Sequence, residues 1–318
     1  MHCPIRTRGT EYGLKDGQIP VRRWGAAVVA SAAALSVLAP ASVAQAASGP
    51  SGVTAKGAYL LDSGSNKGLW NKSGETKRQM ASTTKVMTAV VVLDTKGVNL
   101  DRKVTVKKAY RDYVAKNGAS TADLKTGDKL TVRQLLYGLL LPSGCDAAYA
   151  LADTFGTGST ASARTKSFIS KMNKKADALG MSKTDFDSFD GISQGGKNVS
   201  TPHDLARLAR HAIANKSFAT VVKAASTKQK ATNGRTYTWY NTNKLLGSYS
   251  GAIGIKTGTG TAAGPCLLFA AKRGSRTVVG VILNDSNRYP DAKKMLDWAF
   301  GTKTSMKLRQ LPKGAQQD

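Results

Sequence analysis

Histidine, cysteine and glutamate are all scarce in this chain of 318 residues. Three histidines and three cysteines occur, and His203 and His211 are the only histidines after residue 46, so no cluster has the ligand spacing of a zinc site. We therefore predict neither a metal nor a cofactor. Long apolar runs are missing too, because the alanine-rich segment 25–39 is shorter than the roughly 20 residues of a membrane-spanning helix.

This apolar segment has the surroundings of an export signal. Arg22 and Arg23 precede it, and Ala44-Gln45-Ala46 follows it as a small-residue cleavage site. We interpret residues 1–46 as a secretory signal peptide, with an uncleaved anchor as the less favoured alternative. The chain is thus predicted to be exported, either secreted or held at the wall or membrane surface. Cys145 and Cys266 remain after cleavage, and we expect two free thiols rather than a disulfide.

Acidic residues are also few, with 20 Asp and Glu against 47 Lys and Arg. Removal of the signal peptide leaves 18 acidic and 42 basic residues. Such an excess of positive charge attracts polyanions. The sequence has no nucleic-acid-binding module and no stripe of alternating basic and aromatic residues, so nucleic acid is not a predicted partner. For an exported chain, anionic wall polymers or lipid headgroups fit this charge better.

The spacing of apolar residues changes along the chain. In the middle third it is mostly helical, and Thr131 and Thr201 stand where helix N-caps are expected. In the last third, short apolar runs separated by Gly and Ser turns are typical of an antiparallel meander. We predict an α/β fold, in which an antiparallel sheet flanked by helices is built from both ends of the chain, with a mostly helical lobe inserted. The strands expected in this sheet are 59–61, 253–255, 266–271 and 277–283, and a helix at 291–300 follows them.

Composition indicates where this predicted domain begins and ends. Residues 47–56 are rich in small residues and read as a flexible leader before the domain at 57–300. Residues 301–318 form a basic tail that we predict to be disordered.

Ser82-Thr83-Thr84-Lys85 begins an apolar helical segment. Residues i and i+3 share a helix face, so the Ser82 hydroxyl and the Lys85 amine can meet. A serine hydroxyl becomes a good nucleophile when a neighbouring base takes its proton. The helix N-terminus adds backbone N–H groups where negative charge develops. The alternative interpretation of these four residues alone is a polar helix cap.

Two further motifs follow in the order expected for serine acyl transferases that use a lysine. Ser143-Gly144-Cys145 comes after an apolar helical run, and Lys256-Thr257-Gly258 comes after a strand-like run. A second Lys-Thr-Gly at residues 125–127 precedes Ser143 and lies in a polar turn, so we do not assign it a role.

Together these motifs resemble those of the low-molecular-weight penicillin-binding proteins, the serine-type D-alanyl-D-alanine carboxypeptidase and DD-transpeptidase family. The resemblance extends from about Tyr59 to Phe300. It includes Leu141-Pro142-Ser143-Gly144, Asp146-Ala147-Ala148, Phe189-Asp190-Gly191, Ser200-Thr201-Pro202-His203-Asp204-Leu205 and Asn241-Thr242-Asn243-Lys244-Leu245-Leu246. It implies an enzyme acting on peptidoglycan stem peptides that end in D-Ala-D-Ala, with β-lactams as covalent inhibitors.

The resemblance also implies roles for individual residues. Ser82 would attack the penultimate D-alanine carbonyl, with Lys85 as base and Ser143 passing a proton to the leaving D-alanine. The substrate would lie along a strand edge, and the expected substrate-binding residues are Lys256, Thr257, Gly258, Thr259, Cys145 and Arg288. The backbone N–H groups of Ser82 and Thr259 would form the oxyanion hole. Arg288 would hold the substrate carboxylate, although Arg273 and Arg276 compete for that role.

Cys145 departs from the family pattern, which has asparagine at this position. An amide offers a donor and an acceptor, whereas a thiol offers little of either. This leaves three alternatives open: a carboxypeptidase, a transpeptidase with weak hydrolysis, or a penicillin- or wall-binding module with a weakened site.

Two other hydrolase classes fit less well. A class A β-lactamase needs a glutamate to activate the deacylating water, and no glutamate lies between Ser143 and Lys256. A Ser-His-Asp hydrolase could use Gly191-Ile192-Ser193-Gln194-Gly195, but this motif requires a buried strand before it and a helix after it. Both flanks are polar here, which favours a glycine-rich surface loop.

Overall fold

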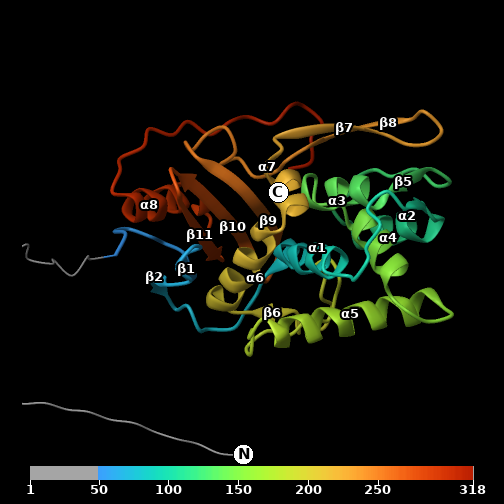
Figure 1. The fold of residues 1–318 in the computed structure, drawn as a ribbon, viewed down its shortest axis with the longest axis horizontal. Coiled ribbons are helices and arrows are strands. Elements are labelled where there is room, and N and C mark those ends of the chain that lie inside the picture. Colours follow the sequence, from blue (N-terminus) through green and yellow to red (C-terminus); the bar gives the residue numbers. More distant parts are fainter. Residues whose placement is uncertain (1–48, 318) are drawn as a thin grey trace, which may run out of the picture. The chain divides into compact units, whose positions relative to one another are not determined.

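A five-stranded antiparallel sheet forms the centre of the computed structural model, which describes residues 49–317. The predicted signal peptide, residues 1–46, lies outside the described residues. The strand order is β2-β1-β11-β10-β9 (Figure 1). The strands are β1 (Gly57–Asp62), β2 (Gly68–Lys72), β9 (Ala252–Gly260), β10 (Gly264–Arg273) and β11 (Arg276–Leu283). Strands from both ends of the chain thus share one sheet, and the predicted α/β architecture is confirmed.

Alternate side chains of the sheet enter two different cores. In β10, Leu267 and Phe269 pack with α8 (Arg288–Phe300), whereas Leu268 and Ala270 pack in the core of the helical lobe. This follows from the period of two along a strand, which points neighbouring side chains to opposite faces. Each fully buried leucine contributes about 1.5–3 kcal/mol relative to an exposed one. Because both faces are covered, β10 reads as a continuous apolar run.

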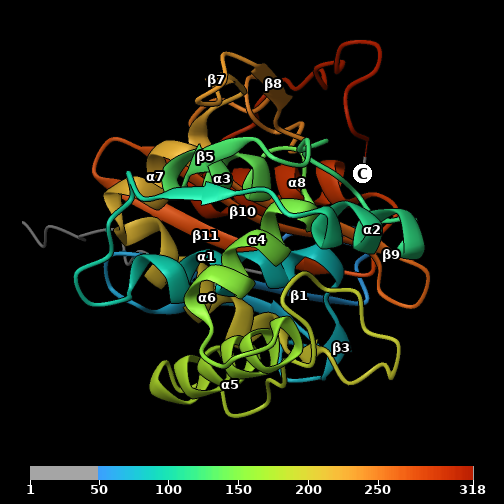
Figure 2. The same cartoon turned by 90° about the vertical axis from the view of Figure 1, so that its right-hand side faces the viewer.

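The inserted lobe consists mainly of helices (Figure 2). Its helical elements are η1 (Ala81–Thr84), α1 (Lys85–Leu93), α2 (Lys108–Asn117), α3 (Val132–Leu140), α4 (Cys145–Phe155), α5 (Ala161–Ala178), α6 (Pro202–Ala214) and α7 (Lys216–Lys223). Its short strand pairs are β3 (Arg78–Gln79) with β6 (Val199–Ser200), β4 (Lys103–Thr105) with β5 (Lys129–Thr131), and β7 (Ser226–Lys230) with β8 (Thr236–Tyr240). The predicted caps are confirmed, since Thr131 and Thr201 accept hydrogen bonds from Gln134 N and Asp204 N.

The leader and the tail contact the domain on both sides of α8. Val53 and Ala55 of the leader are buried, and Thr54 Oγ1 donates to Asp285 Oδ1 and Asp291 Oδ2, each at 2.9 Å. The tail contains no helix or strand within its described part, residues 301–317. In Figure 1 it runs from α8 towards the β7–β8 hairpin. The sequence predicts flexibility for both segments, whereas the structure gives both specific contacts.

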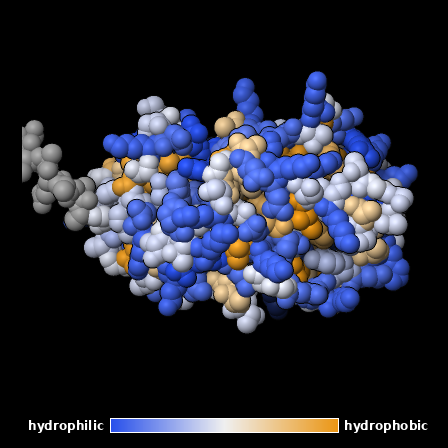
Figure 3. Space-filling model, turned by 90° about the horizontal axis from the view of Figure 1, so that it is seen from below, coloured by the Kyte–Doolittle hydropathy of each residue, from blue (hydrophilic) through white to orange (hydrophobic). Residues whose placement is uncertain are grey.

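None of the helices within residues 49–317 is long and apolar enough to cross a bilayer. The face seen from below α5 and β6 is largely hydrophilic, with small separate apolar patches (Figure 3).

Candidate active site

Ser82 and Lys85 meet at the start of α1. Ser82 lies in the short 3₁₀ turn η1, and Lys85 is the first residue of α1. Lys85 Nζ donates a hydrogen bond of 2.8 Å to Ser82 Oγ, and the lysine side chain is fully buried. The spacing of three residues brings the hydroxyl and the amine together, as the sequence indicated.

The loop between α5 and β6 also contacts this lysine. Lys85 Nζ also donates to the backbone carbonyl of Asp190 at 2.9 Å. The next residue, Gly191, has a φ of +98°, and a Cβ there would lie 2.1 Å from the Ala81 carbonyl oxygen. Only glycine allows this approach without displacing the turn that carries Ser82. The Phe189-Asp190-Gly191 motif therefore fixes both the amine and the nucleophile turn.

Ser143 lies between α3 and α4 in an unusual state. Its φ of +65° is left-handed, which is uncommon for a residue other than glycine. Its hydroxyl is buried and has no hydrogen-bond partner among residues 49–317. Buried polar atoms are nearly always paired, so this one requires a functional explanation.

Cys145 follows as the first residue of α4 and is also buried. Its Sγ lies 3.6 Å from Ser120 Oγ, and that hydroxyl donates to the Ser143 carbonyl at 2.6 Å. Burial raises the pKa of the Cys145 thiol to about 11, the charge of Lys85 lowers it, and the Asp190 carboxylate raises it. The thiol is therefore protonated at neutral pH, and it forms no disulfide with Cys266.

The edge strand β9 approaches Ser82 through Gly258. A Cβ on Gly258 would lie 2.9 Å from the backbone nitrogens of Ser82 and Thr83. This contact brings the Lys-Thr-Gly strand against the nucleophile turn. Thr257 Oγ1 hydrogen-bonds Thr242 Oγ1 at 2.6 Å, which ties β9 to the segment after β8.

The remaining predicted binding residues lie along the same strand. Lys256 is buried, and its Nζ donates to the Thr257 carbonyl at 2.8 Å, whereas Thr259 is exposed. Arg288 Nη1 lies 3.1 Å from both the Gly258 carbonyl and Thr259 Oγ1.

The two competing arginines are engaged away from Thr259. Arg276 pairs with Asp62 at 2.8 Å, and Arg273 lies over the Tyr249 ring, 5.2 Å from its centroid. Of the three candidates, Arg288 therefore has the contacts at β9.

The residues of the alternative hydrolase motif do not assemble. Ser193 Oγ donates to Asp187 Oδ2, while His203 pairs with Glu75 and His211 with Asp94. The segment 191–195 has neither a strand before it nor a helix after it. Within residues 49–317, no group of three or more His, Cys, Asp or Glu is placed to hold a metal ion.

Residues 43–287 match the sequence profile of the family described as D-alanyl-D-alanine carboxypeptidase, in the S11 class of peptidases. This chain belongs to that family. The match covers the nucleophile turn, the Ser143 loop and β9. The predicted family, fold and class of serine carboxypeptidase are confirmed.

Among relatives in this family, the D-alanyl-D-alanine carboxypeptidase of Streptomyces sp. (strain K15) is 54% identical over 256 residues, 78% of this chain and 88% of the relative. The crystal structure of the Streptomyces K15 DD-transpeptidase has a TM-score of 0.77 and 52% identity, covering 80% of this chain and 99% of that one. The D-alanyl-D-alanine carboxypeptidase DacB2 of Mycobacterium tuberculosis is 36% identical, over 76% of this chain and 79% of that protein. The names of these relatives include both a carboxypeptidase and a transpeptidase.

Sequence reasoning missed two contributors to the site. The Asp190 backbone carbonyl accepts a hydrogen bond from Lys85. Because every residue has a backbone carbonyl, the residue type does not reveal such a contact. Ser120 supports the Ser143–Cys145 turn, and nothing in its neighbourhood of small polar residues indicated this. The glycine-rich motif at 191–195 directly follows Asp190 and is the local signal for this contact, but from the sequence we interpret it as a surface loop.

Proposed function

We propose that this protein is an exported serine D-Ala-D-Ala carboxypeptidase that acts on peptidoglycan stem peptides through an acyl-enzyme on Ser82. The observation that carries the proposal is the 2.8 Å hydrogen bond between the buried Lys85 amine and the Ser82 hydroxyl. A nucleophile and a base within hydrogen-bond reach are what covalent catalysis by serine requires.

The acylation step uses three of these side chains. Ser82 Oγ attacks the carbonyl carbon of the penultimate D-alanine, and the amine of Lys85 acts as the base that takes the hydroxyl proton. Ser143 passes a proton to the departing nitrogen, so the C–N bond breaks and D-alanine leaves as an amine. The Ser143 hydroxyl, which has no hydrogen-bond partner among residues 49–317, supports this role, because a bound substrate would supply one.

The charge that develops on the carbonyl oxygen needs fixed donors. The Ser82 and Thr259 backbone N–H groups are our candidates, since Gly258 brings β9 against the nitrogen of Ser82. One such donor typically contributes about 10²–10³-fold in rate. The terminal carboxylate of the substrate would bind Thr259 Oγ1 and Arg288, which lie 3.1 Å apart, with Lys256 supplying further positive charge.

The fate of the acyl-enzyme depends on the acceptor. Water attacking the ester gives hydrolysis, and the amine of a second stem peptide gives transpeptidation. Cys145 offers a protonated, weakly bonding thiol near enough to Lys85 for the lysine charge to lower its pKa. We propose that it limits the hydrolytic rate and leaves transfer as the second activity, in keeping with the two names of the Streptomyces K15 relative.

The decisive experiment is intact mass spectrometry of the mature protein mixed with benzylpenicillin. We expect a stable adduct on the peptide that contains Ser82. An adduct that disappears within seconds as penicillin is consumed would indicate a β-lactamase instead. If no adduct forms, the enzymatic proposal fails and a wall-binding module becomes the better explanation. N-terminal sequencing of the exported protein tests cleavage after Ala46.

Anionic wall polymers are a second proposed partner, and a basic cavity supports them. It has a volume of about 390 Å³ and is lined by Arg207, Arg210 and His211 of α6 with no acidic residue among its lining. Phosphate groups are the anions that arginine pairs best with. We expect Arg207→Gln/Arg210→Gln to weaken binding to poly(glycerol phosphate) about tenfold.

The matched control for this charge change is Lys166→Gln/Lys174→Gln, which removes two exposed charges from α5. Equal weakening by both double variants would show general charge attraction rather than a site.

A further inference from the structure

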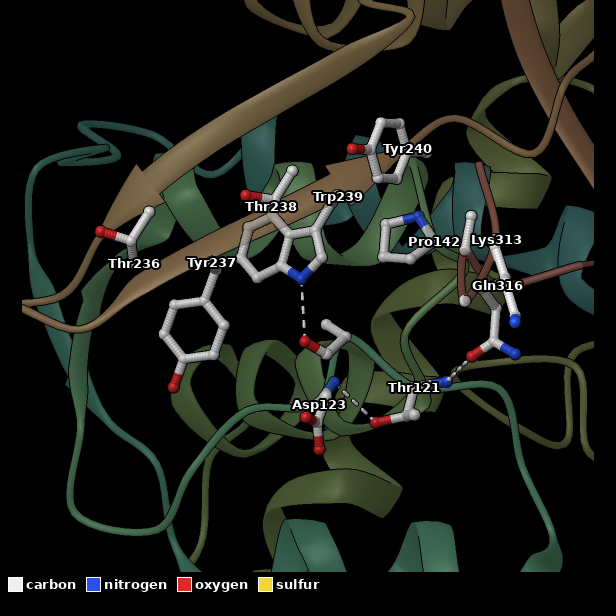
Figure 4. Close-up of a pocket in the computed structure, with 13 residues that line it drawn as sticks. Thr121, Asp123, Pro142, Thr236, Tyr237, Thr238, Trp239, Tyr240, Lys313 and Gln316 are labelled. Atoms are coloured by element: carbon white, nitrogen blue, oxygen red, sulfur yellow. Dashed lines mark hydrogen bonds between the residues drawn. The ribbon is translucent and has the colours of Figure 1, made fainter. Parts of the chain in front are cut away.

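A pocket of about 490 Å³ is lined in part by Pro142, the residue that precedes Ser143 (Figure 4). Its walls are the β8 residues Thr236–Tyr240, the segment Thr121–Asp123, Pro142, and the tail residues Lys313–Gln316. The tail thus closes one side of a cavity whose other sides belong to the domain.

Three of these walls continue directly into the site. Pro142 precedes Ser143, and Thr121 follows Ser120, whose hydroxyl bonds the Ser143 carbonyl at 2.6 Å. Tyr240 leads through one residue to Thr242, which holds Thr257 at 2.6 Å. Consecutive Cα atoms are about 3.8 Å apart, so Pro142 and Tyr240 place two walls of the pocket one and two residues from Ser143 and Thr242.

The domain side of the pocket is held rigidly. Asp146 in the first turn of α4 is fully buried and accepts from Ala122 N at 2.9 Å, Leu124 N at 3.0 Å and Thr121 Oγ1 at 2.8 Å. Trp239 Nε1 donates to the Ala122 carbonyl at 2.8 Å. Carboxylate and indole together fix the segment that faces the tail.

The tail is attached at both of its ends and in its middle. Thr304 N donates to Asp297 Oδ2 at 3.0 Å, and Thr121 N donates to Gln316 Oε1, also at 3.0 Å. Between them the Arg309 guanidinium donates to the backbone carbonyls of Asn241 and Asn243. These carbonyls flank Thr242, so the tail also supports the segment that holds Thr257.

The chemistry of the pocket suits a peptide with an acidic group. Lys313 is exposed at the wall and brings a positive charge, and the Gln316 amide brings a donor. The Asp123 carboxylate is already paired with Arg111 at 3.1 Å and Lys125 at 2.9 Å, so it does not repel an anion. Aromatic faces of β8 supply apolar area beside these polar groups.

We propose that the tail is held in place and forms one wall of a substrate subsite. Lys313 and Gln316 bind the part of the donor stem peptide that precedes D-Ala-D-Ala, including the free α-carboxylate of its D-isoGlu residue. This inference rests on the proposed carboxypeptidase function. It assigns the tail a part in selecting substrate rather than in the bond-breaking step.

The test compares a long donor with a short one. With L-Ala-D-isoGlu-L-Lys-D-Ala-D-Ala, Lys313→Ala/Gln316→Ala should raise KM about tenfold and leave kcat nearly unchanged, since ground-state and transition-state binding are lost equally. With N-acetyl-L-Lys-D-Ala-D-Ala, and for acylation by benzylpenicillin, the variant should match the wild type. The matched control Lys303→Ala/Gln317→Ala removes the same residue types outside the pocket and should match the wild type with both donors.

Several results would overturn the inference. Equal loss with both donors would show a general effect on the reaction centre, and no loss with the long donor would show an unused pocket. A rise confined to the KM of an amine acceptor would assign the pocket to the acceptor instead. A wild type that neither forms the penicillin adduct nor releases D-alanine would refute the proposed function itself.

A second measurement tests whether the tail is held. Arg309→Ala should speed limited proteolysis within residues 302–317 about tenfold, because the open population rises when the contact is lost. Lys307→Ala removes an exposed basic residue two positions away and should leave the cleavage rate unchanged. If wild-type tail is cleaved as fast as Arg309→Ala, the tail is disordered and the inference fails.

Discussion

The reaction centre and the pocket lined by the tail are held together by different kinds of contact. At Ser82 the close approaches involve the main chain: Gly191 against the Ala81 carbonyl, Gly258 against the Ser82 nitrogen, and the Asp190 carbonyl on Lys85. Around the pocket, the tail is held by the side chains of Arg309 and Gln316. Main-chain contacts survive most substitutions, whereas side-chain contacts change with each one. We therefore expect substitutions to change the substrate specificity of the pocket more readily than the reaction at Ser82.

The largest expected effect is loss of the nucleophile or base. Ser82→Ala should reduce acylation by benzylpenicillin by roughly 10⁴-fold or more, and Lys85→Ala nearly as much, because such residues act as a unit. Intact mass against time measures both. Ser193→Ala, in the rejected hydrolase motif, is the control and should acylate normally. Persisting acylation of Ser82→Ala would remove the basis of the proposal.

Gly191→Ala tests the main-chain contacts of the centre. The added methyl group meets the Ala81 carbonyl oxygen at 2.1 Å, so the turn that carries Ser82 must move. We expect acylation to slow about 100-fold, with stability lowered by about 1–3 kcal/mol. In Gly195→Ala, four residues along the same loop, the methyl group meets nothing within 4 Å and should change neither quantity. Similar rates for the two variants would contradict the argument.

Cys145→Asn addresses the balance between hydrolysis and transfer. An amide next to Ser120 supplies the donor and acceptor that the thiol lacks, so release of D-alanine should rise about tenfold. Cys145→Ala supplies neither group and should not raise it. An unchanged or lower hydrolytic rate in Cys145→Asn would show that the thiol does not limit the reaction.

The smallest effect concerns the anchor of the tail at Asp297. Burial raises the pKa of this carboxyl, but hydrogen bonds from Lys293, Thr304 and Tyr249 outweigh it and bring the value to about 2 from the usual 3.8. Because the folded pKa is lowered, the contribution to stability is complete above pH 3.8 and is lost as the pH falls through about 2. The difference in Tm between wild type and Asp297→Asn should shrink between pH 5 and pH 2. A constant difference over that range would contradict this linkage.

The sequence allowed much of the fold to be predicted because its signals are local. The meander of β9, β10 and β11 follows from apolar runs between turns, and the caps at Thr131 and Thr201 follow from residue type. The β7–β8 hairpin was missed because all five residues of the strand Ser226–Lys230 are hydrophilic, so no apolar alternation marks it as a strand.

The contacts of the site also divide into those that local spacing predicts and those that only tertiary packing creates. The spacing of Ser82 and Lys85 shows their contact, because three residues along a helical turn fix it. The Asp190 carbonyl and Ser120 lie 105 and 38 residues from Lys85 and Ser82, and only tertiary packing brings backbone and hydroxyl groups to the site. Disorder of the tail was predicted from composition alone. Composition does not indicate that the Arg309 guanidinium donates hydrogen bonds to three backbone carbonyls.

The position of β9 at the end of the sheet has a consequence for solubility. A strand edge with unpaired backbone groups can add a strand from another molecule, and such edges promote aggregation. Here Gly254 to Gly258 are buried although β9 is the last strand, because η1 and α7 pack against it. The turn that carries Ser82 therefore also covers part of this strand edge, which keeps its backbone groups from pairing with copies of the chain.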